Sequence, residues 1–315
     1  MLRMSFGRRS VASALAALLV MAAGSASESR AQPRDKVVVA SKIDTEGALL
    51  GHMIALVLER QGISVENRVQ LGPTKVVRTA LLSGEIDIYP EYTGNGAFFH
   101  GMENDPSWKS PASAFDTVKR LDREKHNLLW LDRARANNTW LIAVRGDLAR
   151  REKLATMEDF AKLAKRPKSI KLAASAEFVE SPAALPSFER IYDFKLPRDQ
   201  IVVLPGGDTA VTMRAAAQSV SGVNAAMVYG TDGAISALDL VVMDDTKGAQ
   251  IVYEPAPVVR AEVLERHSGI EPTLARVFGT LTMGKLQALN AQIAVEGQPA
   301  REVARRYLEQ EGLLN

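Results

Sequence analysis

The sequence contains no cysteine, and this absence removes several kinds of chemistry at once. A chain without thiols cannot form a disulfide, use a cysteine nucleophile, bind a metal through thiolates or carry a lipid on an N-terminal cysteine. With 315 residues it is long enough to bury a large core without covalent cross-links. We therefore expect a protein that is held together by packing and is free of a lipid anchor.

Catalytic and nucleotide-binding motifs are missing as well. The chain has no His-Glu-x-x-His, no Gly-x-Ser-x-Gly, no Ser-x-x-Lys and no P-loop. The four histidines (His52, His100, His126 and His267) are scattered along the chain without a metal-ligand spacing. These absences favour a binding protein that needs no metal, cofactor or nucleotide. An exported enzyme remains an alternative from another functional class.

Apolar runs are short throughout the chain. The longest candidate, Val11 to Ala23, follows three arginines and precedes small residues that end at Ala31. A membrane-spanning helix needs about 20 apolar residues, and this run is shorter. The layout is typical of a secretory signal peptide, which we predict at residues 1–31. The rest of the chain is then expected in the periplasm.

The basic balance of the whole chain comes from this N-terminal segment. The chain has 39 Lys and Arg against 37 Asp and Glu, which gives a net charge of +2. Residues 1–31 hold four arginines and one glutamate, so the remaining chain has 35 basic and 36 acidic residues. Nothing in this balance favours a nucleic-acid partner.

The remaining chain alternates between short β-branched runs and helical periods. Strands are predicted at residues 37–39, 86–89, 128–131, 140–144, 170–173, 201–204, 225–229 and 240–243, and a helical pattern from residue 258 onward. Such alternation predicts an α/β fold with mostly parallel sheets flanked by helices. About 280 residues exceed one ordinary domain, so we expect two lobes.

Aromatic residues are scarce, at 6% of the chain, yet several fall at strand ends and turns. Tyr89, Tyr92, Trp140 and Tyr229 are the notable ones. A quaternary ammonium group cannot donate a hydrogen bond, and aromatic faces attract its spread positive charge. Simple packing into a core is the more common role of any single ring. The rings become informative only if they meet at one site.

Five short segments carry a family resemblance. They are Ser41-Lys42-Ile43-Asp44-Thr45-Glu46, Tyr89-Pro90-Glu91-Tyr92-Thr93-Gly94, Asn137-Asn138-Thr139-Trp140, Ala174-Ser175-Ala176-Glu177-Phe178 and Tyr229-Gly230-Thr231-Asp232-Gly233. In this order and spacing they resemble the osmoprotectant-binding proteins of ABC importers, which bind glycine betaine, choline and related compounds. Residues 42–99 and 206–233 are most similar to a low-affinity branch of betaine binders.

The resemblance implies a type II-like periplasmic binding protein with a ligand cleft between two α/β lobes. Lobe one would comprise residues 36–137 and 242–315, and lobe two residues 138–241, with two crossing strands between them. It also implies a monomer that delivers its ligand to separate permease subunits. The same fold with another small zwitterion or an amino acid as ligand remains an alternative.

The resemblance also implies a set of ligand-binding residues. Lys42 would face the ligand carboxylate, Asn95 would add a polar contact to it, and Tyr92, Trp140 and Tyr229 would form walls of an aromatic box. Two positions depart from the family pattern, because Ser181 stands where relatives often have Arg and Met213 where a further Tyr is common. The complete predicted set is Lys42, Tyr92, Thr93, Asn95, Asn138, Trp140, Ser181, Met213 and Tyr229. Losing a guanidinium and a ring predicts either weak binding of betaine or a different ligand.

Overall fold

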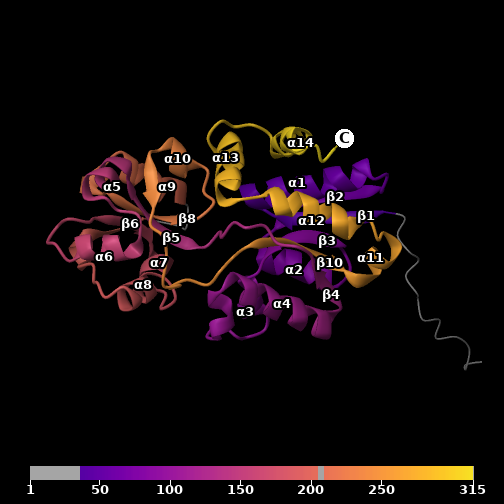
Figure 1. Ribbon diagram of the computed structural model, residues 1–315, viewed down its shortest axis with the longest axis horizontal. Coiled ribbons are helices and arrows are strands. Elements are labelled where there is room, and N and C mark those ends of the chain that lie inside the picture. The colour runs from indigo at the N-terminus through magenta and orange to yellow at the C-terminus, as the bar shows by residue number, and fades with distance from the viewer. Residues whose placement is uncertain (1–35, 205–208, 315) are drawn as a thin grey trace, which may run out of the picture. The chain divides into compact units, whose positions relative to one another are not determined.

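Two five-stranded sheets flanked by helices make up the fold of the computed structural model (Figure 1). The structure describes residues 36–204 and 209–314, so the predicted signal peptide lies outside the described residues. The α/β architecture predicted from the alternating pattern is confirmed. No helix within the described ranges is long and apolar enough to cross a membrane.

The first sheet has the strand order β2-β1-β3-β10-β4. Its strands are β1 (Val37–Lys42), β2 (Val65–Gly72), β3 (Ile88–Tyr92), β4 (Leu128–Trp130) and β10 (Pro255–Arg260). β10 pairs antiparallel with both β3 and β4, and the other pairings are parallel. Four of the five strands therefore run in one direction, which leads their carboxyl ends to one edge of the sheet.

The second sheet repeats this plan with the order β7-β6-β8-β5-β9. Its strands are β5 (Trp140–Arg145), β6 (Leu172–Ser175), β7 (Ile201–Leu204), β8 (Ala225–Tyr229) and β9 (Leu240–Val242). Here β5 is the strand that runs against its neighbours β8 and β9. The prediction of mostly parallel sheets holds for both, because each contains a single reversed strand.

Two parts of the predicted strand pattern were wrong. β2 was missed, because it is an edge strand with charged residues such as Glu66 and Arg68 and has no apolar run. The helical interpretation from residue 258 was also wrong, since Val258 and Val259 lie in β10 and pair with β3 and β4. The strand predicted at residues 86–89 starts at Ile88 and continues to Tyr92.

Helices cover both sheets. The helices associated with the first sheet are α1 (Thr45–Arg60), α2 (Thr74–Leu82), α3 (Asn95–Phe99), α4 (Pro111–His126), α11 (Ala261–Arg266), α12 (Ile270–Thr280), α13 (Met283–Ala294) and α14 (Ala300–Gln310). With the second are α5 (Gly146–Glu152), α6 (Met157–Ala164), α7 (Ala176–Glu180), α8 (Leu185–Ile191), α9 (Thr209–Ala217) and α10 (Ala234–Ala237). Short 3-10 turns lie at Pro106–Lys109, Arg198–Gln200 and Val220–Gly222.

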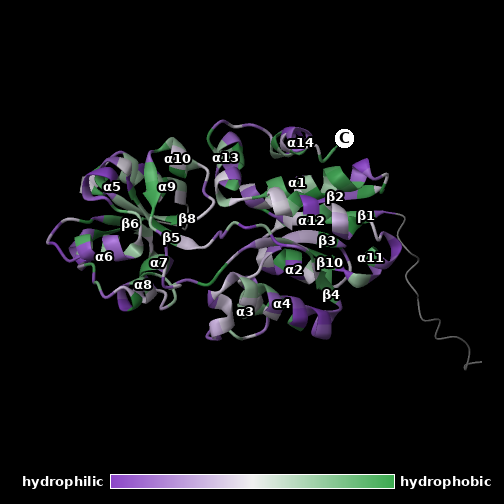
Figure 2. Cartoon of the chain, viewed as in Figure 1, coloured by the Kyte–Doolittle hydropathy of each residue, from purple (hydrophilic) through white to green (hydrophobic). Residues whose placement is uncertain are grey.

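Helix α1 shows how the sequence builds the first layer. Its N-terminal amides are capped by Asp44, whose carboxylate accepts a hydrogen bond from the Gly47 amide at 2.7 Å. The helix buries apolar residues almost all round. Figure 2 shows these hydrophobic residues in green along it. Such a helix belongs inside a layer, and α1 packs between β1, β2 and α14.

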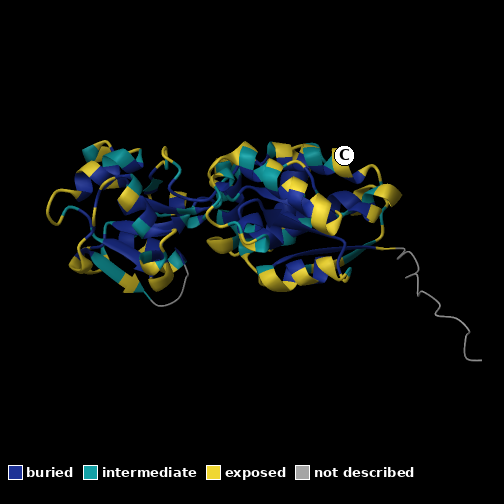
Figure 3. Cartoon of the chain, turned by 90° about the horizontal axis from the view of Figure 1, so that it is seen from below, coloured by how far each residue is buried: buried dark blue, intermediate teal, exposed yellow. Residues whose placement is uncertain are grey.

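Each sheet has its own apolar core. One cluster gathers the second sheet with Phe160, Phe178 and Phe188, and two further clusters lie around the first sheet. Figure 3 shows that the strands of both sheets are mostly buried and that exposed residues lie on the helices outside them. Separate cores are typical of two lobes, each stabilised by its own packing.

The chain passes twice between the sheets, after β4 and after β9, and the two crossing segments are hydrogen-bonded to each other. The Asn138 amide donates to the Tyr253 carbonyl at 2.9 Å, and the Thr139 hydroxyl donates to the Ile251 carbonyl at 2.8 Å. A further hydrogen bond joins α13 to the turn after β8, where the Gln287 side chain donates to the Gly230 carbonyl at 2.8 Å. The exact lobe boundaries stay a prediction.

Candidate functional site

A cavity of about 1470 Å³ is lined by residues from both sheets and from the crossing segments. It lies where β1, β3, β6 and β8 end, which is the edge at which ligands bind in open α/β sheets. Eight of the nine predicted site residues line it, namely Lys42, Tyr92, Asn95, Asn138, Trp140, Ser181, Met213 and Tyr229. The ninth, Thr93, is buried away from the cavity, where it bonds to the Val252 carbonyl and the Glu254 amide.

Two stacked rings form the wall contributed by the second sheet. Trp140 and Tyr229 stand directly opposite each other on the antiparallel strands β5 and β8, so their side chains lie on the same face. Their ring centroids are 6.2 Å apart, with an interplanar angle of 23°. Phe178 packs edge-on behind Trp140, with a centroid distance of 6.0 Å. The pair therefore packs against the core and offers aromatic surface to the cavity.

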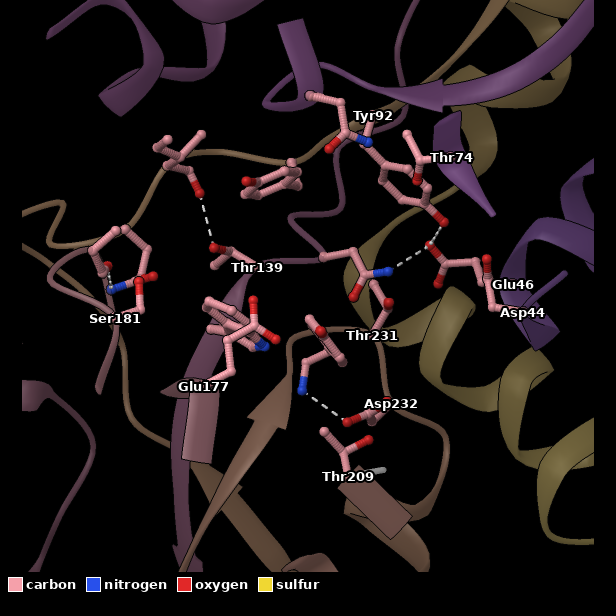
Figure 4. Close-up of a pocket in the computed structure, with 18 of the residues that line it drawn as sticks. Asp44, Glu46, Thr74, Tyr92, Thr139, Glu177, Ser181, Thr209, Thr231 and Asp232 are labelled. Carbon is pink, nitrogen blue, oxygen red and sulfur yellow. Dashed lines mark hydrogen bonds between the residues drawn. The ribbon is translucent and has the colours of Figure 1, made fainter. Parts of the chain in front are cut away.

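Tyr92 is positioned differently from this pair. Its side chain is almost fully buried, and its hydroxyl donates to Glu46 at 2.8 Å (Figure 4). The Lys42 ammonium lies 4.5 Å from the centre of its ring. One face of Tyr92 is thus already occupied by a cation of the protein.

A fourth ring, Tyr253, also lines the cavity and was missed by the sequence analysis. It lies in the second crossing segment, and its amide donates to the Asn137 side chain at 2.8 Å. Burial raises the pKa of its hydroxyl above the ordinary range. Nothing in the local sequence distinguishes this tyrosine, because its position depends on the pairing of the two crossing segments.

Lys42 forms a buried ion pair with Glu91. The Glu91 carboxylate also accepts hydrogen bonds from the Tyr89 hydroxyl at 2.9 Å and from the Asn95 amide group at 2.7 Å. Lys42 and Asn95 were both predicted to face a ligand carboxylate. In the structure both bind the Glu91 carboxylate of the protein instead. Their assignment to the ligand stays a prediction.

Glu46 is the buried carboxyl group on the first-sheet side of the cavity. It accepts hydrogen bonds from the Tyr92 hydroxyl at 2.8 Å, from Asn138 Nδ2 at 3.3 Å and from Asn290 Nδ2 at 2.7 Å. Burial raises its pKa from 4.5 to about 7, although hydrogen bonds from Thr231, Tyr92 and Asn290 act in the opposite direction. Glu46 stands within the first segment that carried the family resemblance, but its role was not assigned there.

Carboxylates from both sides of the cavity act on the stacked rings. Burial raises the pKa of the Tyr229 hydroxyl, and the negative charges of Glu177, Asp232 and Asp44 raise it further. Figure 4 shows Glu177 and Asp232 among the side chains of the second-sheet wall. The stacked pair therefore lies in a negative electrostatic environment, which suits a cation.

The two departures from the family pattern have distinct surroundings. Ser181 is the C-terminal cap residue of α7. As a serine, it cannot supply the guanidinium group that relatives often have at this position. Met213 touches the cavity but is 2% exposed and packs in the core of the second sheet. Arg190 from α8 and Arg214 from α9, which the sequence analysis did not select, also line the cavity.

Three residues elsewhere have the geometry of a possible metal site. His100, Asp122 and His126 offer ligand atoms that lie within 4.8 Å of one another, so the description of these histidines as scattered was wrong in space. The Asp122 carboxylate, however, forms two hydrogen bonds with Arg78, at 2.6 and 2.8 Å, and a third with Trp130 at 2.7 Å. This guanidinium already neutralises the carboxylate, so the cluster is better explained as a structural ion pair.

The fold and the cavity together define a class of protein. Two α/β lobes, each with its own core, and a cavity lined from both are the architecture of the periplasmic solute-binding proteins. Within that class the chain belongs to the family of substrate-binding domains of ABC-type glycine betaine transport systems, whose model matches residues 35–310.

Relatives of known name agree with this family. The chain is 54% identical over 281 residues to the glycine betaine-binding protein YehZ of Escherichia coli strain K12, which covers 89% of this chain and 92% of that protein. The structure of apo YehZ from Escherichia coli matches with a TM-score of 0.83 and 55% identity, over 88% of this chain and 99% of that one. The ergothioneine transport permease and binding protein EgtU of Helicobacter pylori strain G27 is 28% identical, over 88% of this chain and 48% of its own length.

Proposed function

We propose that this protein is the solute-binding component of an ABC importer and that it holds a small quaternary-ammonium compound, such as glycine betaine, in the cavity. The observation that carries the proposal is the stacked Trp140–Tyr229 pair, which faces the cavity among carboxylates. A trimethylammonium group needs polarisable faces and negative potential rather than hydrogen-bond acceptors. The glycine betaine-binding relative, at 54% identity, supports the same ligand class.

The proposed ligand-binding set keeps the predicted residues that line the cavity and adds two more. Trp140, Tyr229 and Tyr253 would surround the ammonium group, with Tyr92 behind them and Glu46 on the first-sheet wall. A ligand between the walls contacts both lobes only when they approach each other, so binding would favour a closed form. The lobes proposed for this motion are residues 36–137 with 242–315, and residues 138–241.

The proposed surroundings of the protein follow from its class. It would act in the periplasm as a monomer without catalytic activity, metal or nucleotide. The permease and ATPase subunits of the importer would be its partners. ATP hydrolysis by the purified protein would contradict this part of the proposal.

A different small zwitterion is the second candidate ligand. It is favoured by the Lys42–Glu91 ion pair and by Ser181, which together leave the expected carboxylate contacts occupied or missing. One relative of this chain, at 28% identity, is named for binding ergothioneine, which is a different ligand. This candidate keeps the fold and the transport role and changes the chemistry opposite the aromatic pair.

Calorimetric titration of residues 32–315 tests the proposal directly. The compounds are glycine betaine, choline, carnitine, proline betaine and a set of amino acids at neutral pH. We expect saturable binding of at least one quaternary-ammonium compound, and loss of that binding in Trp140→Ala. Saturable binding of amino acids alone would favour the second candidate, and turnover of any compound would favour an enzyme.

A further inference from the structure

Glu46 is a cavity-lining carboxyl group whose hydrogen-bond partners are all neutral. Tyr92, Asn138 and Asn290 donate to it, and it is 4% exposed. Within residues 36–204 and 209–314, no Lys, Arg or His forms an ion pair with it. Buried carboxylates are ordinarily paired with a cation, so the usual counter-ion of this group is missing.

The charged groups around Glu46 do not supply that counter-ion. Lys42, from the end of β1, is committed to Glu91 of β3. Asp44, which precedes α1, adds a like charge that raises the pKa of Glu46. The other elements packed against it contribute neutral groups, namely Tyr92 from β3, Thr231 from the turn after β8 and Asn290 from α13. The open side of Glu46 is the cavity.

Two neighbouring amides add to the negative potential at this point. Asn138 and Asn290 both turn their Nδ2 atoms to Glu46, and Asn290 Nδ2 also donates to the Thr231 carbonyl at 2.9 Å. Their Oδ1 atoms are buried and have no hydrogen-bond partner among the described residues. The negative ends of two amide dipoles therefore remain beside a carboxyl group.

On the opposite wall, the carboxylates near Tyr229 have the same sign as Glu46, although Arg190 and Arg214 of that wall also line the cavity. Glu177 and Asp232 lie close enough to Tyr229 for their charges to act on its hydroxyl. A positive group between Glu46 and the Trp140–Tyr229 pair would thus be attracted by Glu46 and by the carboxylates near Tyr229. A carboxylate at the same place would be repelled by the same groups.

We propose that Glu46 is a specificity-determining residue that acts as counter-ion to the ammonium group of the ligand and releases a proton when that group binds. This inference rests on the proposed function, because it assumes a quaternary-ammonium ligand. The affinity that the Glu46 carboxylate adds is larger for ligands without a carboxylate, such as choline, than for zwitterions such as glycine betaine. In a zwitterion the ligand's own negative charge partly offsets the attraction.

The proton balance of the step is simple. With a pKa of about 7, roughly half of the Glu46 side chains in the free protein carry a proton at neutral pH. A bound cation stabilises the carboxylate, so the O–H bond of the protonated fraction breaks and the proton passes to the buffer. Binding of a cation therefore becomes tighter as the pH rises through this value. Between pH 6 and pH 8 the expected gain for a strongly coupled cation is about tenfold.

The test is calorimetric titration with choline and with glycine betaine at pH 6, 7 and 8, in buffers with different enthalpies of ionisation. For choline we expect an affinity gain of about tenfold from pH 6 to pH 8 and release of about half a proton at pH 7. For glycine betaine we expect a smaller gain. Glu46→Gln should abolish the proton release and flatten the pH profile, whereas the control Glu103→Gln, another carboxylate lining the cavity, should keep both.

Three outcomes separate the possibilities. A choline affinity that is constant with pH, or a slope that survives in Glu46→Gln, overturns the role of Glu46 while leaving the proposed function intact. Absence of binding of both compounds by the unaltered protein at every pH overturns the proposed function itself. If Glu46→Gln does not fold, Tyr92→Phe serves instead. It removes one donor to the carboxylate, and the midpoint of the pH profile must then move upward.

Discussion

The two walls of the cavity are stabilised by different interactions. The first-sheet wall is a buried polar network, in which Lys42, Glu46 and Glu91 are bonded to neighbouring side chains. The second-sheet wall is a pair of stacked rings backed by Phe178, with carboxylates nearby. One wall is held by charge and hydrogen bonds, and the other by packing.

From this difference we expect changes in the first wall to affect mainly the fold, and changes in the second wall to affect mainly the ligand. Removing one member of a buried ion pair leaves a desolvated charge behind, so its cost appears in the free energy of unfolding. Truncating a ring that lines an open cavity leaves no buried charge, so its cost should appear mainly in ligand affinity. The predictions below test this division from the largest effect to the smallest.

The largest effect is expected for Lys42→Met. The substitution leaves Glu91 buried without its cation and should lower the free energy of unfolding by about 3–5 kcal/mol. Chemical denaturation measures this value. Adding Glu91→Gln to Lys42→Met should recover part of the loss, because no charge is then left unpaired.

The matched control for Lys42 is an exposed ion pair on α4. Arg120 and Glu124 are 3.0 Å apart and more than half exposed, so Arg120→Met should change stability by less than about 1 kcal/mol. If Lys42→Met cost as little as this control while weakening glycine betaine selectively, Lys42 would belong to the ligand, as the family resemblance implies.

The next effect concerns the pH dependence of stability at Glu46. Its pKa is about 7 in the folded protein against 4.5 ordinarily, so the folded state binds more protons between these values. The stability that this group contributes is fully present below pH 4.5 and is lost as the pH rises through 7. Relative to the unaltered protein, Glu46→Gln should therefore gain about 3 kcal/mol between pH 4.5 and pH 8. Denaturation at several pH values measures the difference, and a constant difference would contradict the raised pKa.

A smaller effect, confined to the ligand, is expected for the rings of the second wall. Trp140→Ala or Tyr229→Ala should weaken a trimethylammonium ligand by roughly tenfold, which corresponds to about 1–2 kcal/mol for each ring. Titration calorimetry gives the affinity, and thermal unfolding shows whether the fold is kept. Loss of stability without a selective effect on the ligand would mean that the rings are core residues.

The smallest effect is expected for Ser181→Arg. A guanidinium at this position could reach a ligand carboxylate, but Glu177 lies one helical turn earlier and competes for it. We expect glycine betaine to bind about twofold to fivefold tighter and choline to show no gain. Equal changes for both ligands would place residue 181 outside the carboxylate site.

Much of the fold could be predicted because strand and helix patterns are local. The β-branched run of β1 and the helical period of α1 indicate their structures directly, and their alternation indicates an α/β fold. β2 and β10 were lost for the opposite reason. Their conformation depends on strands distant in sequence, and their own residues carry no strong pattern.

The candidate site was predictable where a short motif and a strand end coincide. Tyr92, Trp140 and Tyr229 each end or begin a strand within a segment that resembles the family. Tyr253 and Asn290 have no such segment. They reach the cavity because the second crossing segment pairs with the first and because α13 packs against the turn after β8.

The class of fold, the absence of cysteine and of familiar catalytic motifs, and the aromatic residues available for a ligand can all be read from the sequence. These features depend on composition and on local periods, which need no knowledge of distant contacts. Which charges face the cavity depends on tertiary packing. It pairs Lys42 with Glu91 and leaves Glu46 among neutral donors, since the partner of a buried charge is set by packing across some fifty residues of sequence and not by its neighbours in the chain.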